Sequence, residues 1–293
     1  LVDPRGVQRT DLAAAGHTIY ATARNESSIE DLEDLGCRTL ALDVTDEASM
    51  KAAVDTVVAE EGAVGALVNN AGYGSYGAVE DVPIAEARRQ FEVNVFGLAR
   101  LSQLVLPAMR RARAGTIVNI SSMGGRGWTA VGGWYHATKH AVEVLSDAMR
   151  VETRPFGIRV VVVQPGRIES EWSATAARTL RDSGAKSAYR DQIEPLAEML
   201  EDYGGAAAPE VVADAVAKAV NSANPKRRYA TPADARVMIF LHWLLPDAAW
   251  EWLMRTALAA AARNDLGDTL QKQTGTGVRP AGRLAPGDAE LHW

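Results

Sequence analysis

Short apolar runs alternate with longer segments of helical periodicity between about residue 17 and residue 232. The runs are rich in β-branched residues, and several are apolar throughout, as strands of a parallel sheet covered on both faces usually are. Longer segments repeat apolar residues at the three- and four-residue spacing of amphipathic helices. This alternation predicts a doubly wound, mostly parallel α/β sheet. The predicted strands are His17–Ala23, Arg38–Val44, Ala66–Ala71, Thr116–Ser121, Ile158–Gln164 and Arg227–Thr231.

Predicted helices fill the gaps between the strands and place a helical layer on each face of the sheet. They are Ser28–Leu35, Glu47–Glu61, Ile84–Arg113, Tyr135–Arg154 and Pro209–Ala223. Residues 166–205 carry no clear strand and follow the fifth predicted strand, where doubly wound folds place ligand-covering insertions. This segment is therefore predicted to be a substrate lid.

Two further amphipathic helices are predicted at Ala235–Leu245 and Ala248–Ala262. They fit a cap that packs on the core, an apolar substrate wall or a membrane-surface contact, and the cap is favoured. The remaining residues are rich in Gly, Pro, Thr and Asp without apolar periodicity, which predicts a disordered tail. The expected organisation is an α/β domain over residues 1–232, a helical cap over 233–263 and a tail over 264–293.

Composition excludes several classes of function. The 293 residues carry a formal net charge of −6, which supplies no basic field for a nucleic acid backbone. No segment reaches the roughly 18 apolar residues that a transmembrane helix needs. The single cysteine, Cys37, cannot form an internal disulfide and suits a reducing compartment. We therefore expect a cytoplasmic protein with a small-molecule partner, and the sequence leaves open whether it forms a homo-oligomer.

Candidate chemistry is concentrated in Ser122, Tyr135 and Lys139. Ser122 closes a predicted strand, at the edge where open α/β sheets bind ligands, and could donate a hydrogen bond to a carbonyl oxygen. Tyr135 and Lys139 open a predicted helix, and their four-residue spacing places them on one helical face. A tyrosine has a pKa of about 10, and a nearby ammonium favours its phenolate form. The three residues therefore predict an acid/base site for carbonyl or alcohol chemistry.

Several neighbouring residues have less specific patterns. A Tyr-x-x-x-Lys pair alone occurs in many helices by chance. His136 and His140 have the spacing of two zinc ligands on a helix, but residue 137 is Ala and no third ligand is evident, so we predict no metal site. Three apolar side chains near the candidate site fit either a substrate pocket or plain core: Met123, Trp128 and Trp134.

Five further segments add context to the Ser-Tyr-Lys set. With this context the chain, from about Leu12 to about Pro232, resembles the single-domain short-chain dehydrogenases/reductases, which are Rossmann-type NAD(P)-dependent oxidoreductases. The segments are Ala21-Thr22-Ala23-Arg24, Leu42-Asp43-Val44, Asn69-Asn70-Ala71-Gly72, Phe91-Glu92-Val93-Asn94-Val95 and Pro165-Gly166-Arg167-Ile168-Glu169-Ser170.

The resemblance implies roles for individual residues. Asn94 stands at the family's fourth catalytic position, whose backbone carbonyl holds a relay water beside the lysine, and Tyr135 and Lys139 also contact the cofactor. Asp43 and Val44 stand where the family contacts adenine. The positions implied along the cofactor's ribose and nicotinamide are Asn70, Ala71, Gly72, Pro165, Gly166, Ile168 and Ser170, with Ser170 where threonine is usual.

Arg24 bears on the choice of cofactor. It ends the second strand of the family's pattern, where an acidic residue would hold a ribose 2′-hydroxyl, whereas a guanidinium would accept a 2′-phosphate. The resemblance therefore implies NADP, with NAD as the alternative. An arginine after a strand can also be simply solvated.

The segment before Leu12 departs from the family pattern. The family has a first strand and a Thr-Gly-x-x-x-Gly-x-Gly turn whose backbone N–H groups hold the pyrophosphate, and Leu1–Thr10 contains no such turn. In this fold the first strand is central, so a damaged or missing first strand is expected to leave two strand edges without a partner. We expect weakened cofactor binding and a nearly inactive chain.

The sequence thus predicts hydride transfer between NADP(H) and an apolar secondary alcohol or carbonyl compound. The alternative is a catalytically impaired protein that keeps the fold as a binding or interaction module. An isomerase or epimerase of the family's extended branch is disfavoured, because that branch normally carries a larger substrate domain.

Overall fold

The computed structural model describes residue 12, residues 16–201 and residues 205–274. Each pair of neighbouring strands in it is parallel, which confirms the predicted doubly wound α/β fold. The strands are β1 (Tyr20–Ala23), β2 (Arg38–Ala41), β3 (Ala66–Asn69), β4 (Gly115–Ile120), β5 (Ile158–Pro165) and β6 (Arg228–Thr231).

The helices connect these strands and form the C-terminal region. Three segments are 3-10 helices: η1 (Glu26–Leu35), η3 (Met123–Gly125) and η4 (Arg154–Phe156). A fourth segment, η2 (Glu92–Gly97), is a π-helix. The α-helices are α2 (Glu47–Glu61), α3 (Ile84–Phe91), α4 (Leu98–Ala112), α5 (Gly133–Thr153), α6 (Glu171–Gly184), α7 (Arg190–Glu201), α8 (Glu210–Asn221), α9 (Ala233–Leu244) and α10 (Asp247–Thr274).

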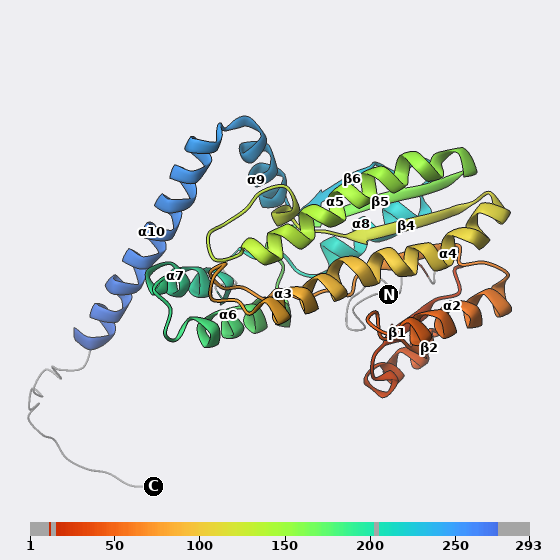
Figure 1. Ribbon diagram of the computed structural model, residues 1–293, viewed down its shortest axis with the longest axis horizontal. Helices are drawn as coiled ribbons and strands as arrows, with labels where there is room; N and C mark the ends of the chain where they lie inside the picture. Colours follow the sequence, from red (N-terminus) through yellow and green to blue (C-terminus); the bar gives the residue numbers. More distant parts are fainter. Residues whose placement is uncertain (1–11, 13–15, 202–204, 275–293) are drawn as a thin grey trace, which may run out of the picture.

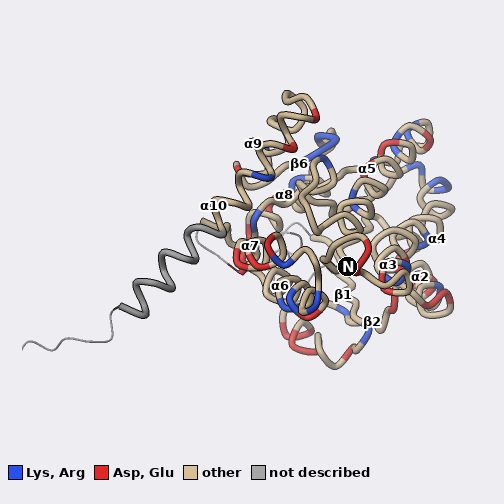
Figure 2. The backbone as a smooth tube through the Cα atoms, turned by 60° about the vertical axis from the view of Figure 1, so that its left-hand side comes forward, with Lys and Arg blue, Asp and Glu red and all other residues tan. Residues whose placement is uncertain are grey.

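Helices cover both faces of the larger sheet (Figure 1). Successive side chains of β4 point to opposite faces, as in any strand. Ile117 therefore joins a buried cluster with Leu101 of α4, whereas Val118 packs with Val216 of α8. Acidic and basic residues are interspersed along the described chain (Figure 2).

The strands form two separate sheets, ordered β1-β2 and β3-β4-β5-β6, and within the described residues no strand lies between β1 and β3. The facing edges of β1 and β3 are the two edges that the sequence predicts to lack a partner if the first strand is damaged or missing. Two buried side-chain oxygens on the same strands, Thr22 Oγ1 and Asn69 Oδ1, have no hydrogen-bond partner among the described residues.

The helix predicted over residues 84–113 contains one irregular turn, the π-helix η2. Asn94 lies in this turn and is 1% exposed. Its amide accepts a hydrogen bond from the backbone N–H of Tyr73 at 3.0 Å and donates to the Tyr73 carbonyl at 2.9 Å. π-turns often occur at functional sites, and apolar periodicity did not reveal this one.

The predicted lid segment contains the helices α6 and α7, which pack with each other. The C-terminal helix α9 is anchored by the fully buried Ala235, and α10 by Trp250, whose Nε1 donates to the Trp128 carbonyl at 3.2 Å. Trp243 and Trp252 are exposed. The sequence left three interpretations of these helices open. The burial of Ala235 and Trp250 agrees with the first of them, a helical cap that packs on the core. None of the described helices combines the length and apolar character needed to cross a bilayer.

The prediction of a disordered tail over residues 264–293 is wrong for residues 264–274, because α10 continues to Thr274. Once a helix has formed, each added residue gains a hydrogen bond without a new nucleation step. The added segment contains good helix formers such as Leu266, Gln271 and Lys272. Residues 275–293 lie outside the described part of the chain.

Candidate active site

Tyr135 and Lys139 lie in the first turns of α5, and both side chains are buried. The Lys139 Nζ lies 5.9 Å from the centroid of the Tyr135 ring. It donates a hydrogen bond to the carbonyl of Ile120, the last residue of β4, at 3.0 Å. This bond uses one of the three protons of the ammonium and leaves two for other acceptors.

Ser122 lies between β4 and η3 and belongs to the same cluster. Its Oγ accepts a hydrogen bond from the backbone N–H of Gly124 at 3.1 Å. A hydrogen bond between Ser122 and Tyr135 lowers the pKa of the tyrosine, against the larger effect of its burial. The structure therefore brings Ser122, Tyr135 and Lys139 together at the carboxyl end of β4.

Burial reverses the direction of the pKa shift expected for Tyr135. Desolvation raises its pKa to about 12, and Ser122 opposes this increase. Burial also lowers the pKa of Lys139 to about 8, although attraction to Glu143 works in the other direction. The sequence argument assigned the lowering of the tyrosine pKa to Lys139. In the structure the group that lowers the tyrosine pKa is Ser122.

Asn94 and Gly72 border the cluster. The Asn94 amide also donates to Thr138 Oγ1 of α5 at 3.1 Å, so it ties η2 to the helix that carries Tyr135 and Lys139. A Cβ atom at Gly72 would lie 3.1 Å from Asn94 Oδ1 and 3.6 Å from Lys139 Nζ. The missing side chain therefore leaves backbone accessible directly beside the lysine.

Comparison with known proteins agrees with this geometry. A model of the short chain dehydrogenase family matches residues 9–181. The chain belongs to this family. It is 32% identical to a probable short-chain type dehydrogenase/reductase, VdlC, of Helicobacter pylori, over 85% of this chain and 92% of that protein. This short-chain dehydrogenase is therefore an NAD(P)-dependent oxidoreductase acting on a small molecule.

Two further similarities extend over most of the chain. A 3-ketodihydrosphingosine reductase of Bacteroides thetaiotaomicron is 34% identical, over 83% of this chain and 90% of that protein. The crystal structure of a short-chain dehydrogenase from Streptomyces avermitilis superimposes with a TM-score of 0.70 at 30% identity, covering 92% of this chain and 93% of the other.

The predicted adenine end of the dehydrogenase site lies after β1 and β2. Arg24 is exposed, and Asp43 is partly buried. The pKa of Asp43 is lowered by hydrogen bonds from the backbone and hydroxyl of Thr45 and, to a smaller extent, by the charge of Arg24. Arg24 and Asp43 therefore lie close enough for their charges to interact.

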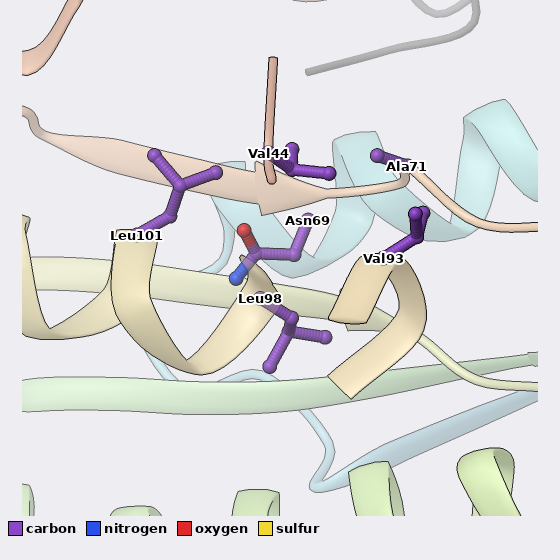
Figure 3. Close-up of a pocket in the computed structure, with 6 residues that line it drawn as sticks. All are labelled: Val44, Asn69, Ala71, Val93, Leu98 and Leu101. Carbon is purple, nitrogen blue, oxygen red and sulfur yellow. The ribbon is translucent and has the colours of Figure 1, made fainter. Parts of the chain in front are cut away.

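Val44, Asn70 and Ala71 were predicted to flank the cofactor. Val44 and Ala71 both line a small pocket, shown in Figure 3, whose other lining residues are Asn69, Val93, Leu98 and Leu101. Asn70 is partly buried between Asn69 and Ala71 in the chain. Val44 and Ala71 therefore lie near each other, just beyond the end of β3.

The predicted nicotinamide-side turn, Pro165 to Ser170, follows β5 and is held by Asp234 of α9. Its carboxylate accepts from the backbone N–H of Arg167 at 3.0 Å, and a Cβ atom at Gly166 would lie 2.4 Å from it. Ile168 forms an isolated parallel bridge with Ala207, and Ser170 caps α6. The sequence analysis missed Asp234, although an acidic residue in a first helical turn is a recognisable capping signal.

Two aromatic side chains that the sequence analysis missed flank Tyr135. The ring centroids of Tyr76 and Trp172 lie 5.2 and 5.3 Å from that of Tyr135. Trp172 belongs to α6, and buried residues of α6 and α7 pack in the same cluster as Tyr135. The helices α6 and α7 therefore pack over this tyrosine.

The aromatic residues considered from the sequence lie elsewhere. Trp134 lines a surface groove with residues of α3, η2 and their junction, and its Nε1 donates to the Val79 carbonyl at 3.4 Å. Trp128 is 40% exposed and contacts Trp250 through its carbonyl. Neither tryptophan is among the aromatic side chains stacked against Tyr135 in the described residues.

The two histidines of α5 form no metal site. Both ring nitrogens of His136 are engaged by protein groups, and His140 Nδ1 lies 2.9 Å from the His136 carbonyl. In the part of the chain that the structure describes, no cluster of three His, Cys, Asp or Glu side chains could hold an ion.

Proposed function

We propose that this short-chain dehydrogenase reduces an apolar ketone with NADPH. The observation that carries the proposal is the cluster of Ser122, Tyr135 and Lys139, together with the arginine beside Asp43 at the other end of the site. The residues fit a dinucleotide. Arg24 supplies a cation for a ribose phosphate, and Gly72 leaves room for a sugar beside the Lys139 ammonium.

The protein residues position and protonate the substrate. NADPH, when bound, supplies the hydride. Ser122 Oγ accepts the Gly124 N–H, and its hydroxyl hydrogen, which bonds to Tyr135 when no substrate is present, can donate to the substrate carbonyl oxygen instead. Tyr135, within hydrogen-bond reach of Ser122, donates its proton to the same oxygen as negative charge develops there. Lys139 donates to a ribose hydroxyl and holds a positive charge beside the phenol, and Asn94 supports proton supply through its backbone carbonyl.

The protonation states favour reduction at neutral pH. The raised pKa of Tyr135, about 12, keeps the phenol protonated, and a protonated phenol is the acid that ketone reduction needs. Oxidation of an alcohol would need the phenolate as a base. The Tyr76 and Trp172 rings beside Tyr135 favour an apolar substrate. The name of the 3-ketodihydrosphingosine reductase, a relative of the chain, is consistent with a ketone on an apolar chain.

A direct assay tests this function. Purified protein is incubated with NADPH and a series of aliphatic ketones of increasing chain length, and loss of NADPH fluorescence is followed. We expect turnover that increases with chain length and is lost when NADPH is omitted. NADPH binding without turnover of any ketone would support the alternative, a protein that keeps the fold only as a binding module. The similarity to dehydrogenases and reductases speaks against that alternative.

Cofactor preference is expected to depend on Arg24. Arg24→Asp removes a charge-assisted contact worth about 1.5–3 kcal/mol, so the preference for NADPH over NADH should fall about tenfold to a hundredfold. The ratio of the two dissociation constants measures this change. Arg38→Asp is the matched control, because Arg38 is an exposed arginine at the opposite end of β2 and pairs with Glu60 and Glu61. Equal binding of NADH and NADPH by the unaltered protein would remove Arg24 from the site.

The pH dependence of reduction is expected to follow Lys139. Its pKa of about 8 means that the side chain loses its charge as the pH rises through this value, while Tyr135 stays protonated. The kcat/KM for ketone reduction should therefore be constant at lower pH and fall above about pH 8. The groups facing this lysine are Tyr135, Asn94 and Glu143.

Glu143 provides a sharper form of the same test. It is buried, accepts from Gln164 Nε2 and Arg228 Nε at 2.9 Å each, and its charge raises the pKa of Lys139. Glu143→Gln should move the alkaline limb of the profile about one pH unit lower. Asp147→Asn is the control, because Asp147 also pairs with Arg228 but does not affect the lysine. A profile that shifts equally in both variants would contradict the assignment.

A cytoplasmic location is proposed on the sequence alone, from the single cysteine, and homo-oligomer formation stays open. Cell fractionation and light scattering address these two points.

A further inference from the structure

His136, the residue after the catalytic tyrosine, is buried and has no part in the chemistry described above. Its Nδ1 lies 3.0 Å from the Gly124 carbonyl, and its Nε2 lies 3.0 Å from Thr129 Oγ1. Gly124 and Thr129 both belong to the loop that connects Ser122 to α5. The imidazole therefore spans this loop from the helix that carries Tyr135.

The partners determine the tautomer of the imidazole. A carbonyl oxygen can only accept, so Nδ1 must carry the proton and donate to Gly124. Nε2 then accepts from the Thr129 hydroxyl. Burial lowers the pKa of His136 to about 4, which agrees with a neutral ring. Neither bond requires a charge.

Two glycines leave space for the ring and hold it in place. A Cβ atom at Gly124 would lie 2.6 Å from Nδ1, and one at Gly132 would lie 2.7 Å from Nε2. The Tyr76 and Tyr135 rings meet the imidazole edge-on, with centroids at 6.1 and 5.6 Å. The ring is enclosed on several sides, so it has little freedom to turn.

The loop itself needs restraint. Val131, a β-branched residue, has a φ of 49°, in the left-handed region that such residues rarely adopt and that costs about 1–3 kcal/mol. Backbone strain of this kind persists only where surrounding contacts hold it. Contacts that hold this loop include the His136 bonds, a hydrogen bond from Gly77 N–H to the Val131 carbonyl at 2.7 Å and the bond from Trp250 Nε1 to the Trp128 carbonyl.

The Gly124 residue connects the histidine to the catalytic serine. Its N–H donates to Ser122 Oγ at 3.1 Å, while its carbonyl accepts from His136. A shift of Gly124 would therefore move the donor that orients the Ser122 hydroxyl. We infer that His136 is a positioning residue, which locks Gly124 and thereby aims the Ser122 hydroxyl at the substrate oxygen shared with Tyr135.

Two isosteric variants separate the two bonds of the imidazole. In His136→Asn the side-chain amide can replace Nδ1 as donor to Gly124, and in His136→Gln it reaches instead toward Thr129. We expect His136→Gln to lower kcat for ketone reduction about thirtyfold to a hundredfold, the size of effect that a misplaced group produces. His136→Asn should stay within about threefold of the parent, and the KM for NADPH should be unchanged in both. Thr129→Val is the matched control and should have little effect.

This inference rests on the proposed reduction, so a second readout independent of activity is needed. Nitrogen NMR of the imidazole should show the neutral Nδ1–H tautomer, and the Gly124 amide should exchange its hydrogen about tenfold faster in His136→Gln than in His136→Asn. A parent protein that reduces no ketone but shows this tautomer and exchange pattern contradicts the proposed function alone. An Nε2–H tautomer, or equal kcat and equal exchange in the two variants, overturns the positioning role.

Discussion

Tyr135→Phe is expected to lower kcat for ketone reduction about a thousandfold, because the variant lacks the proton donor. General acid catalysis by a positioned group contributes roughly 10² to 10⁴ in rate. The phenylalanine ring keeps the packing against Tyr76 and Trp172, so the fold should be retained. NADPH binding should change by no more than about threefold, since the phenol contributes little to it compared with the phosphates. Steady-state kinetics and calorimetric titration measure the two quantities.

Tyr76→Phe is the matched control for this variant. Tyr76 is also buried, lies in the same cluster and has a pKa raised well above its ordinary value by burial. Nothing in the proposed mechanism uses its hydroxyl, so kcat should stay within about twofold of the parent. If Tyr135→Phe kept more than about a tenth of the parent kcat, or if Tyr76→Phe lost as much activity, Tyr135 would not be the acid.

Cofactor affinity should rise about a hundredfold to ten-thousandfold when a strand followed by a Thr-Gly-x-x-x-Gly-x-Gly turn is placed ahead of Leu12. Such a turn offers backbone N–H groups to the pyrophosphate, and two charge-assisted bonds of about 1.5–3 kcal/mol each produce this gain. The added strand can pair with β1 and β3, between which no strand lies in the described part of the chain. Calorimetric titration of both proteins with NADPH and their thermal unfolding are the measurements.

A version of the added segment with valines in place of the glycines separates the two effects. It can still pair as a strand, so the melting temperature should rise as with the glycine version, but its side chains keep the backbone from the pyrophosphate. Affinity should then stay near that of residues 1–293 alone. Micromolar NADPH binding by residues 1–293 without any addition would mean that other residues of this chain hold the pyrophosphate.

Much of the architecture could be predicted because it depends on local pattern. The six predicted strands each overlap an observed one, since apolar runs and their flanking turns are properties of short segments. The spacing of Tyr135 and Lys139 placed both on one helical face for the same reason. Leu1–Thr10 lacks the sequence pattern of the central strand and turn, which predicts a break between β1 and β3, and no strand lies between them in the described residues.

Irregular backbone and segment ends were less predictable. The π-turn at Asn94 depends on hydrogen bonds to Tyr73, a residue on another segment. The continuation of α10 beyond the predicted Ala262 depends on helix propagation, which overrides weak periodicity. Neither effect has a signal in the spacing of apolar residues.

Fold class could be inferred from periodicity, and the candidate catalytic residues from the spacing of Tyr135 and Lys139 together with the resemblance to the short-chain dehydrogenases/reductases. Folding alone placed Trp172 over Tyr135, Asp234 against Gly166 and His136 beside Gly124. It also raised the pKa of the tyrosine that the sequence argument expected to be lowered. The physical reason is the same in each case. Contacts between residues distant along the chain, and the burial that these contacts cause, arise only when the segments have packed together, so the resulting effect on a side chain has no local sequence signal.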